Sequence, residues 1–220
     1  NREHKFMYPR QGSSLYHTSK IMDTDLLWFY TRTWDIKVTD LMQGPVYGFM
    51  TSEMGNDPNL YTSFFYDEIF GTVLNRFLIQ ALSNIPLTVN GSGNQKRSYL
   101  NIIDTLECIK IACKNPPRKG EMKIYNQFTE TFSVNELALK VKNASKILNI
   151  NVTVNNKKNP RKESEEHYYN PNNSSLKKLG LKPTFLTEER LTDMLNSLLK
   201  YKKNINLDII EKNISNVTHC

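Results

Sequence analysis

The sequence that decides the fold runs from residue 13 to residue 42 and reads SSLYHTSKIMDTDLLWFYTRTWDIKVTDLM. Its first part carries apolar residues at the spacing of one helix face: Leu15, Ile21, Met22, Leu26, Phe29 and Tyr30. Ser13 or Ser14 can cap this helix, which we predict over residues 13–35. Residues 36–42 then predict a short buried strand, closed by a Gly-Pro pair. A helix that leads directly into a strand is typical of α/β chains.

Further helices are indicated downstream by apolar spacing and by capping residues. We predict them over residues 66–84, from Asp104 to Lys114, from the Ser133–Glu136 capping box to about Leu148, and from Thr187 to about Tyr201. A polar stretch at residues 155–175 is predicted to be a long loop.

Strands alternate with these helices. Residues 122–126 and 152–154 each predict a strand, and residues 87–89 and 98–100 flank the turn 91–94 and predict a hairpin. No internal repeat is visible. The alternation indicates an α/β fold with at least part of a parallel sheet.

The composition is that of a folded domain. The 220 residues are 39% hydrophobic and 23% charged, which excludes disordered, collagen-like and coiled-coil classes. No apolar run approaches the length of a membrane span, so we expect a soluble protein without membrane insertion. The 3 cysteines are too few and too badly spaced for a zinc site or a disulfide framework, so we predict no metal.

The charge balance suits an anionic partner. Lys and Arg outnumber Asp and Glu by 29 to 22, which gives a net charge of +7. The excess forms neither a tail nor a stripe, and no helix-turn-helix, zinc-finger or RNP-like pattern accompanies it, so we predict no nucleic-acid partner. A small phosphorylated ligand needs only one or two well-placed arginines, and that class stays open.

Residues 16–20 (YHTSK) carry the first group of side chains with a possible mechanism. Tyr16 and Lys20 lie four residues apart, one above the other on a helix face. A free tyrosine titrates near pKa 10, and a nearby ammonium favours the phenolate and lowers that value. The pair could therefore take a proton from a sugar or alcohol hydroxyl. A solvated lysine on an amphipathic helix is the alternative.

Seven collinear blocks between residues 7 and 185 extend this signal: 8–20, 41–48, 70–77, 86–89, 95–104, 126–136 and 159–170. On these blocks the chain resembles the extended short-chain dehydrogenase/reductases, the NAD-dependent epimerase/dehydratase family. Tyr-x-x-x-Lys and Val-Tyr-Gly are typical of the whole family. The run Arg-Gln-Gly-Ser-Ser before the tyrosine, and Glu-Glu-His-Tyr-Tyr-Asn near residue 167, resemble the subgroup that makes UDP-sulfoquinovose from UDP-glucose and sulfite.

The resemblance implies a tightly held NAD and a UDP-glucose substrate. Tyr16 would be the base at the sugar 4-hydroxyl, and Lys20 would bind the nicotinamide ribose. Tyr16, Gln43 and Val46 would also contact the cofactor. The 4-keto sugar would lose water from C6 and add sulfite. His17 could carry a further proton, although a packing or solvent role fits it equally well.

By the resemblance, Arg97 and Arg161 match the two family arginines that hold the diphosphate. Arginine suits this role because a guanidinium binds phosphate oxygens bidentately. The resemblance implies further substrate contacts at Thr72, Asn75, Arg76, His167 and Tyr168. For the first three the alternative is capping of a helix, and for the last two it is packing of a loop.

The resemblance also implies an organisation. We expect the C-terminal part of a Rossmann-type doubly wound parallel sheet plus a smaller α/β substrate-binding domain. Residues 1–50 and about 101–132 would belong to the NAD-binding domain, and about 51–100 and 133–220 to the UDP-sugar-binding domain. The 9 glycines include no dinucleotide phosphate loop, so we expect the N-terminal nucleotide-binding half to be missing and the fragment alone to be inactive.

Two departures from the subgroup leave other outcomes open. Met42 stands where an Asn is usual, and residues 101–104 replace an Asp-Ile-Arg-Asp run. A UDP-glucose 4-epimerase, a 4,6-dehydratase and a non-catalytic UDP-sugar-binding fragment are the alternatives. We expect the intact protein to be a homodimer, in the chloroplast stroma of a photosynthetic eukaryote or in the cytoplasm of a prokaryote.

Overall fold

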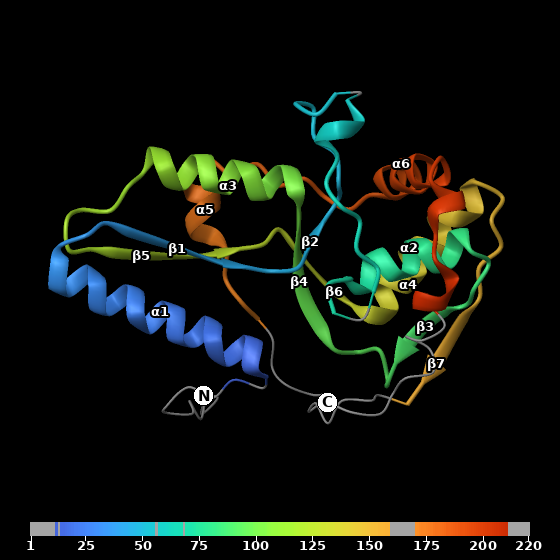
Figure 1. The fold of residues 1–220 in the computed structure, drawn as a ribbon, viewed down its shortest axis with the longest axis horizontal. Helices are drawn as coiled ribbons and strands as arrows, with labels where there is room; N and C mark the ends of the chain where they lie inside the picture. Colours follow the sequence, from blue (N-terminus) through green and yellow to red (C-terminus); the bar gives the residue numbers. More distant parts are fainter. Residues whose placement is uncertain (1–11, 13, 56, 68, 159–169, 211–220) are drawn as a thin grey trace.

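The fold is organised around a helix that returns into a parallel strand pair, as the opening stretch predicts (Figure 1). The structure is a computed structural model, and it describes residue 12 and residues 14–55, 57–67, 69–158 and 170–210. Helix α1 (Leu15–Trp34) begins at Ser14, whose Oγ accepts a hydrogen bond from the His17 N–H, and ends at Asp35, which has a φ of 50°. The predicted helix and cap are confirmed.

The strand that follows α1 pairs with a distant strand. β1 (Val38–Gln43) lies parallel to β5 (Met122–Gln127), in a register that places Gln43 opposite Gln127. Figure 1 shows α1 on one side of this pair and the helices α3 (Ile102–Lys114) and α5 (Ser174–Lys178) on the other. The pair is therefore a layer between helices, as in doubly wound α/β folds.

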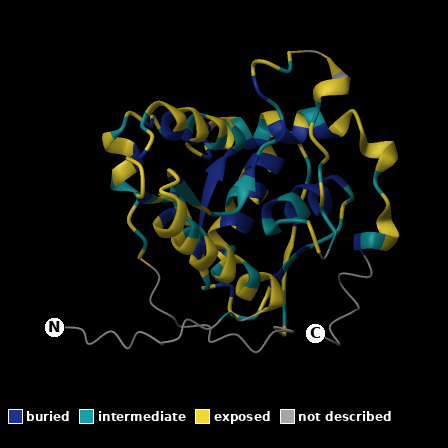
Figure 2. Ribbon diagram, turned by 60° about the vertical axis from the view of Figure 1, so that its left-hand side comes forward, coloured by how far each residue is buried: buried dark blue, intermediate teal, exposed yellow. Residues whose placement is uncertain are grey.

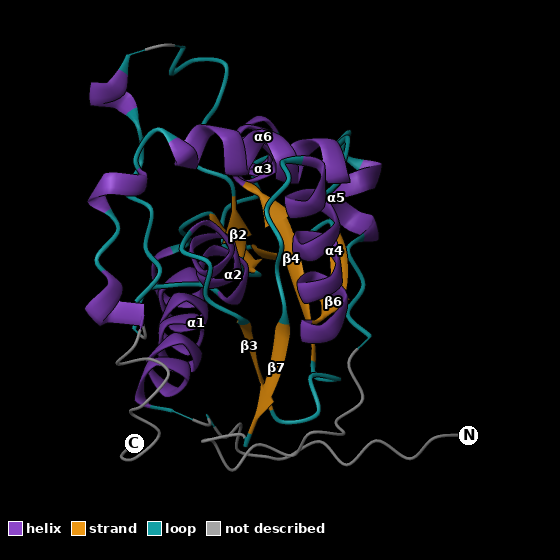
Figure 3. Cartoon of the chain, turned by 90° about the vertical axis from the view of Figure 1, so that its right-hand side faces the viewer, coloured by secondary structure: helices purple, strands orange, loops and turns teal. Residues whose placement is uncertain are grey.

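The remaining strands form two small sheets beside this layer (Figures 1 and 3). In the three-stranded sheet, β4 (Lys96–Asn101) lies between β2 (Val46–Tyr47), to which it is parallel, and β6 (Glu130–Ser133), to which it is antiparallel. The other sheet pairs β3 (Leu87–Asn90) in parallel with β7 (Val154–Lys157).

The larger core lies where three helices pack on these two sheets. The helices are α2 (Val73–Leu82), α4 (Val134–Ile147) and α6 (Glu188–Leu199). Their fully buried side chains include Leu74, Phe77, Leu78, Leu137, Leu191 and Leu195. A smaller cluster under α3 joins Cys108 and Ile111 to Leu176 and Leu181. Figure 2 shows the buried residues between the helices, whose outer faces are exposed. Short 3-10 turns occur at η1 (Pro58–Leu60) and η2 (Lys202–Asn204).

The predicted hairpin is wrong, because β3 and β4 follow one another but pair elsewhere. The turn between them is held by α4: the Asn135 side chain donates to the Ser92 carbonyl (2.9 Å), and the Asn135 N–H donates to the Gly93 carbonyl (3.1 Å). Gly93 has a φ of +73°, which favours glycine. With the turn anchored there, the two strands diverge into different sheets.

The predicted helix 66–84 is wrong over its first seven residues. The Asp67 carboxylate accepts from the N–H groups of Ile69 and Phe70, both at 2.8 Å, and this local turn replaces a helical start. Helix α2 begins only after Thr72, its N-cap. It ends at Leu82, followed by the C-cap Ser83 and by Asn84 in a left-handed conformation, close to the predicted end.

Several other predicted helices are present, with starts or ends shifted by a few residues. The capping box is confirmed, since Ser133 and Glu136 exchange both hydrogen bonds, and α6 starts after Thr187. α6 ends at Leu199, and Asn101 rather than Asp104 is the N-cap of α3.

The strand predicted at residues 152–154 is β7, which lies at residues 154–157. The stretch 155–175, predicted as a loop, contains the end of β7 and the start of α5. Among the described residues, none of the helices combines the length and apolar character needed to cross a membrane.

Candidate active site at the carboxyl ends of two parallel strands

One hydrogen bond fixes the position of α1 along the length of β1. The Thr24 hydroxyl donates to the Asp40 carboxylate at 3.0 Å, and the two elements run in opposite directions. Tyr16 lies eight residues before Thr24, or about 12 Å along the helix. Gln43 lies three residues beyond Asp40, or about 10 Å along the strand. The first turns of α1 are therefore level with the carboxyl ends of β1 and β5.

Tyr16 and Lys20 come together on this part of α1, as predicted. The Lys20 ammonium lies 5.8 Å from the centroid of the Tyr16 ring. Its Nζ also binds the Asp23 carboxylate at 2.8 Å. That hydrogen bond and the charge of Asp23 raise the pKa of Lys20, which keeps it protonated. The Tyr16 side chain is 74% exposed, so a ligand can reach it.

His17 follows Tyr16 on the exposed first turn, where its backbone N–H donates to Oγ of the N-cap Ser14. Its role as a proton carrier stays a prediction.

Gln43 and Val46 flank the turn that leaves β1. Gln43 ends the strand, and its side-chain Nε2 donates to Oε1 of Gln127 at 3.2 Å. The turn needs Gly44, because a Cβ there would collide with the carbonyl oxygen of Ser98. Val46 starts β2, half-buried and opposite Leu100. The two predicted cofactor contacts therefore lie at the carboxyl end of β1, where open α/β sheets bind ligands.

Sequence reasoning missed Gln127. It is 1% exposed and ends β5 next to Gln43. The signal was available, because the predicted strands 36–42 and 122–126 each stop just before a glutamine.

The predicted substrate residues of α2 shape the turn that precedes the helix. Thr72 Oγ1 accepts from the Asn75 N–H at 3.3 Å, and Asn75 Nδ2 donates to the Phe65 carbonyl at 2.9 Å. Arg76 Nη1 donates to the carbonyls of Asp67 (3.2 Å) and Gly71 (2.6 Å). The buried Oδ1 of Asn75 has no hydrogen-bond partner among the described residues.

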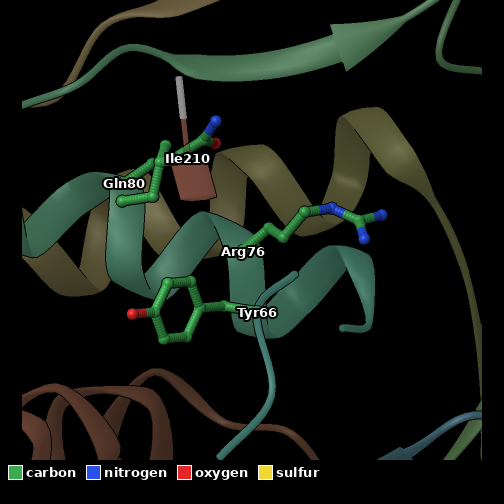
Figure 4. Close-up of a pocket in the computed structure, with 4 residues that line it drawn as sticks. All are labelled: Tyr66, Arg76, Gln80 and Ile210. Carbon is green, nitrogen blue, oxygen red and sulfur yellow. The ribbon is translucent and has the colours of Figure 1, made fainter. Parts of the chain in front are cut away.

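A small hollow of about 10 Å³ lies beside this turn, lined by Tyr66, Arg76, Gln80 and Ile210 (Figure 4). The Tyr66 hydroxyl accepts from the Asn206 N–H at 2.9 Å. This volume is below that of typical small-molecule sites, so the hollow is not a substrate pocket.

Arg97 lies on β4 opposite Phe132, half-buried, and its Nη1 donates to the Lys96 carbonyl at 2.9 Å. The other predicted phosphate ligand, Arg161, lies outside the described residues, as do His167 and Tyr168.

A buried polar junction, also missed from the sequence, ties the segment before α6 to the sheet. The Tyr47 hydroxyl lies 3.4 Å from Glu130 Oε2 and 3.1 Å from the Thr184 carbonyl oxygen. Glu130 Oε2 accepts from the Leu186 N–H at 2.6 Å, and Asp104 accepts from the Thr184 N–H at 2.9 Å. Burial raises the pKa of both Tyr47 and Glu130. The junction is a structural link between β2, β6, α3 and α6.

Two curated relatives are similar over nearly the whole chain. A chloroplastic UDP-sulfoquinovose synthase of Spinacia oleracea is 45% identical over 208 residues, which cover 94% of this chain and 43% of the relative. A UDP-sulfoquinovose synthase of Sulfolobus acidocaldarius is 41% identical over 198 residues, covering 90% and 50%. The chain thus spans about half the length of the curated relatives it matches.

Solved structures share the fold. A crystal structure of UDP-glucose 4-epimerase from Bifidobacterium longum, in complex with NAD⁺ and UDP, superposes with a TM-score of 0.67 at 16% identity. The match covers 89% of this chain and 58% of the epimerase. Residues 3–126, more than half of the 220, match a family described as the NAD dependent epimerase/dehydratase family. By this match and by its fold, the chain belongs to the NAD dependent epimerase/dehydratase family.

Proposed function

We propose that this chain is the catalytic-base and substrate-binding part of a UDP-sulfoquinovose synthase, an enzyme that makes UDP-sulfoquinovose from UDP-glucose and sulfite. The observation that carries the proposal is the Tyr16–Lys20 pair at the carboxyl ends of β1 and β5. The subgroup is supported by 45% identity to the spinach synthase over 94% of this chain.

The residues present fit the nicotinamide end of NAD. Tyr16, Lys20, Gln43 and Val46 belong to the end of the strand layer where α/β folds bind such ligands. The sequence carries no phosphate loop for the other half of the cofactor. When bound, NAD supplies the acceptor, and later the donor, of a hydride at sugar C4.

The chain's own residues move and hold protons. The Tyr16 phenolate oxygen takes the proton of the sugar 4-hydroxyl, and the Lys20 ammonium stabilises the phenolate. Asp23 holds that ammonium in place. The resulting 4-keto group would acidify the proton on C5, so that this proton and the C6 hydroxyl leave as water and sulfite adds at C6. His17 is the candidate for a further proton transfer.

The substrate is held at its diphosphate and sugar. Arg97 and Arg161 bind the phosphate oxygens, and Thr72, Asn75 and Arg76 line the approach from α2. Within the part of the chain that the structure describes, the buried Oδ1 of Asn75 has no hydrogen-bond partner, which supports a donor from the ligand at this point. His167 and Tyr168 line the uridine or sugar pocket.

The intact protein is a homodimer that pairs through α1. Apolar side chains stand exposed along this helix, away from the buried Thr24 and Thr31: Leu15 (86%), Met22 (59%), Leu26 (48%) and Phe29 (48%). An exposed apolar row of this kind marks an interaction surface. The compartment is the chloroplast stroma if the source is a photosynthetic eukaryote, and the cytoplasm if it is a prokaryote.

The test supplies the full-length protein that contains this chain with UDP-glucose, sulfite and NAD. Mass spectrometry should detect UDP-sulfoquinovose, and its formation should require sulfite. UDP-galactose or a 4-keto-6-deoxy sugar formed without sulfite would instead assign a 4-epimerase or a 4,6-dehydratase. Binding of UDP without any turnover would assign a non-catalytic sugar-nucleotide-binding role.

A further inference from the structure

The buried glutamine at the end of β5 connects three elements. Gln127 is 1% exposed, and its Oε1 accepts from Gln43 Nε2 at the end of β1 (3.2 Å). Its own Nε2 donates to the Thr105 carbonyl in the first turns of α3 (3.2 Å). The amide also lies beside the thiol of Cys108, one turn further along α3. A buried amide with this many partners has a fixed orientation.

The backbone of α3 determines which way the amide points. The Thr105 carbonyl oxygen can only accept a hydrogen bond, so Gln127 must turn its Nε2 toward α3. Its Oε1 then faces β1, where it can only accept. Gln43 is therefore obliged to turn its Nε2 inward, and this leaves the Gln43 Oε1 on the outer side of the strand end.

We propose that Gln127 is a positioning residue for the cofactor: it orients the exposed Gln43 amide so that Oε1 accepts a hydrogen bond from an N–H or O–H of bound NAD. The inference rests on the proposed function, because it takes the end of β1 as the nicotinamide site. Gln43 is exposed there and level with Tyr16 and Lys20. The donors that NAD offers near this end are the nicotinamide carboxamide and the ribose hydroxyls.

The test measures NADH binding to the complete apo-protein by fluorescence for Gln127→Met, for Gln43→Met and for the double variant. Methionine keeps the length of the side chain and removes both amide groups. Loss of one hydrogen bond should raise Kd about three- to tenfold in each single variant. The double variant should lose no more NADH affinity than Gln43→Met alone, since Gln127 acts only through Gln43.

Gln80→Met is the matched control. Gln80 is also buried, and it bridges α2 to Thr88 on β3 through both ends of its amide. The Gln80→Met substitution should lower the stability of the fold and leave NADH affinity unchanged. Unchanged affinity in Gln43→Met, or additive losses in the double variant, would overturn the proposal. Because Gln43 is exposed, its variant should fold, and unchanged NADH affinity in it overturns the proposal even where Gln127→Met does not fold.

A cofactor analogue identifies the donor. In 3-acetylpyridine adenine dinucleotide a methyl ketone replaces the carboxamide, so the analogue has no amide N–H. If the variants weaken the binding of NAD more than that of the analogue, the donor is the carboxamide. If they weaken the binding of both equally, the donor is a ribose hydroxyl. The sulfite-dependent product is assayed separately. A wild-type protein that binds NAD but forms no UDP-sulfoquinovose contradicts the proposed function alone, whereas normal synthesis with unaffected variants contradicts this inference alone.

Discussion

At the scale of single residues, the candidate base depends on neighbours within its own helix. Lys20 lies one turn after Tyr16 and one turn before Asp23, so a single helix face carries phenol, ammonium and carboxylate in order. All three groups are exposed, which weakens the interaction between their charges through solvent screening. We infer that bound cofactor and sugar, by excluding water, give the pair its full effect on the proton of the substrate.

Tyr16→Phe tests this chemistry in the complete protein. Removing a general base should lower kcat about 10²- to 10⁴-fold, while NAD affinity changes little. Steady-state rates with UDP-glucose and sulfite, set against cofactor binding, measure both quantities. Tyr30→Phe is the control, because this tyrosine lies toward the other end of α1 and stacks on Trp34 at 5.0 Å. Full activity in Tyr16→Phe would contradict the assignment of the base.

At the scale of elements, capping side chains fix where the helices start. Ser14, Thr72, Asn101, Ser133 and Thr187 each accept a hydrogen bond from a backbone N–H in the first turn that follows. These caps satisfy donors that a helix leaves unpaired. Two of these helix starts, those of α1 and α2, carry candidate site residues, so the caps also position the proposed site.

Ser133→Ala should destabilise the protein by about 1 kcal/mol, because it removes the acceptor for the Glu136 N–H in the capping box. Urea unfolding at neutral pH measures the change in free energy. Ser175→Ala, within the short helix α5, is the control and should have a smaller effect. Equal losses in the two variants would mean that the box contributes nothing specific.

At the scale of the whole molecule, one contact joins parts that are distant in sequence, and one apolar surface stays exposed. Glu130 connects the sheet to the segment before α6 through the Leu186 N–H, 56 residues away. The exposed apolar row of α1, by contrast, has no cover within the described residues. The first feature holds this chain together, and the second supports the proposed homodimer.

Glu130→Gln should change the pH dependence of stability. Burial raises the pKa of Glu130, so its contribution is fully present below the unfolded pKa of about 4.3 and is lost as pH rises through the folded pKa. Glutamine does not ionise and can still accept from the Leu186 N–H. The unfolding free energy of the variant should therefore rise relative to wild type between pH 4 and pH 8. Urea unfolding measures both free energies. A difference between variant and wild type that stays constant across this pH range would contradict the raised pKa of Glu130.

Leu26→Glu should split the proposed homodimer of the complete protein. Leu26 is 48% exposed on α1, and a charge there would have to be buried in the interface. Sedimentation measures the mass. Leu139→Glu is the matched control, because Leu139 is 58% exposed on α4, away from this face. A monomeric wild type, or a dimer that survives the substitution, would contradict pairing through α1.

Several assignments stay predictions at this scale. The division into an NAD-binding part (residues 1–50 and about 101–132) and a UDP-sugar-binding part is one of them. The roles of Arg161, His167 and Tyr168 are others, since these residues lie outside those that the structure describes.

The sequence by itself determined what depends on near neighbours. Helix periodicity, the cap at Ser14, the Ser133–Glu136 box and the Tyr16–Lys20 pair are all local, and each is present as predicted. The tertiary structure decided the rest. It broke the hairpin because Asn135, 43 residues from Ser92, anchors the turn. It also joined Gln43 to Gln127 across 84 residues. Pairings of this kind depend on which strands come to lie side by side, and no local pattern carries that information.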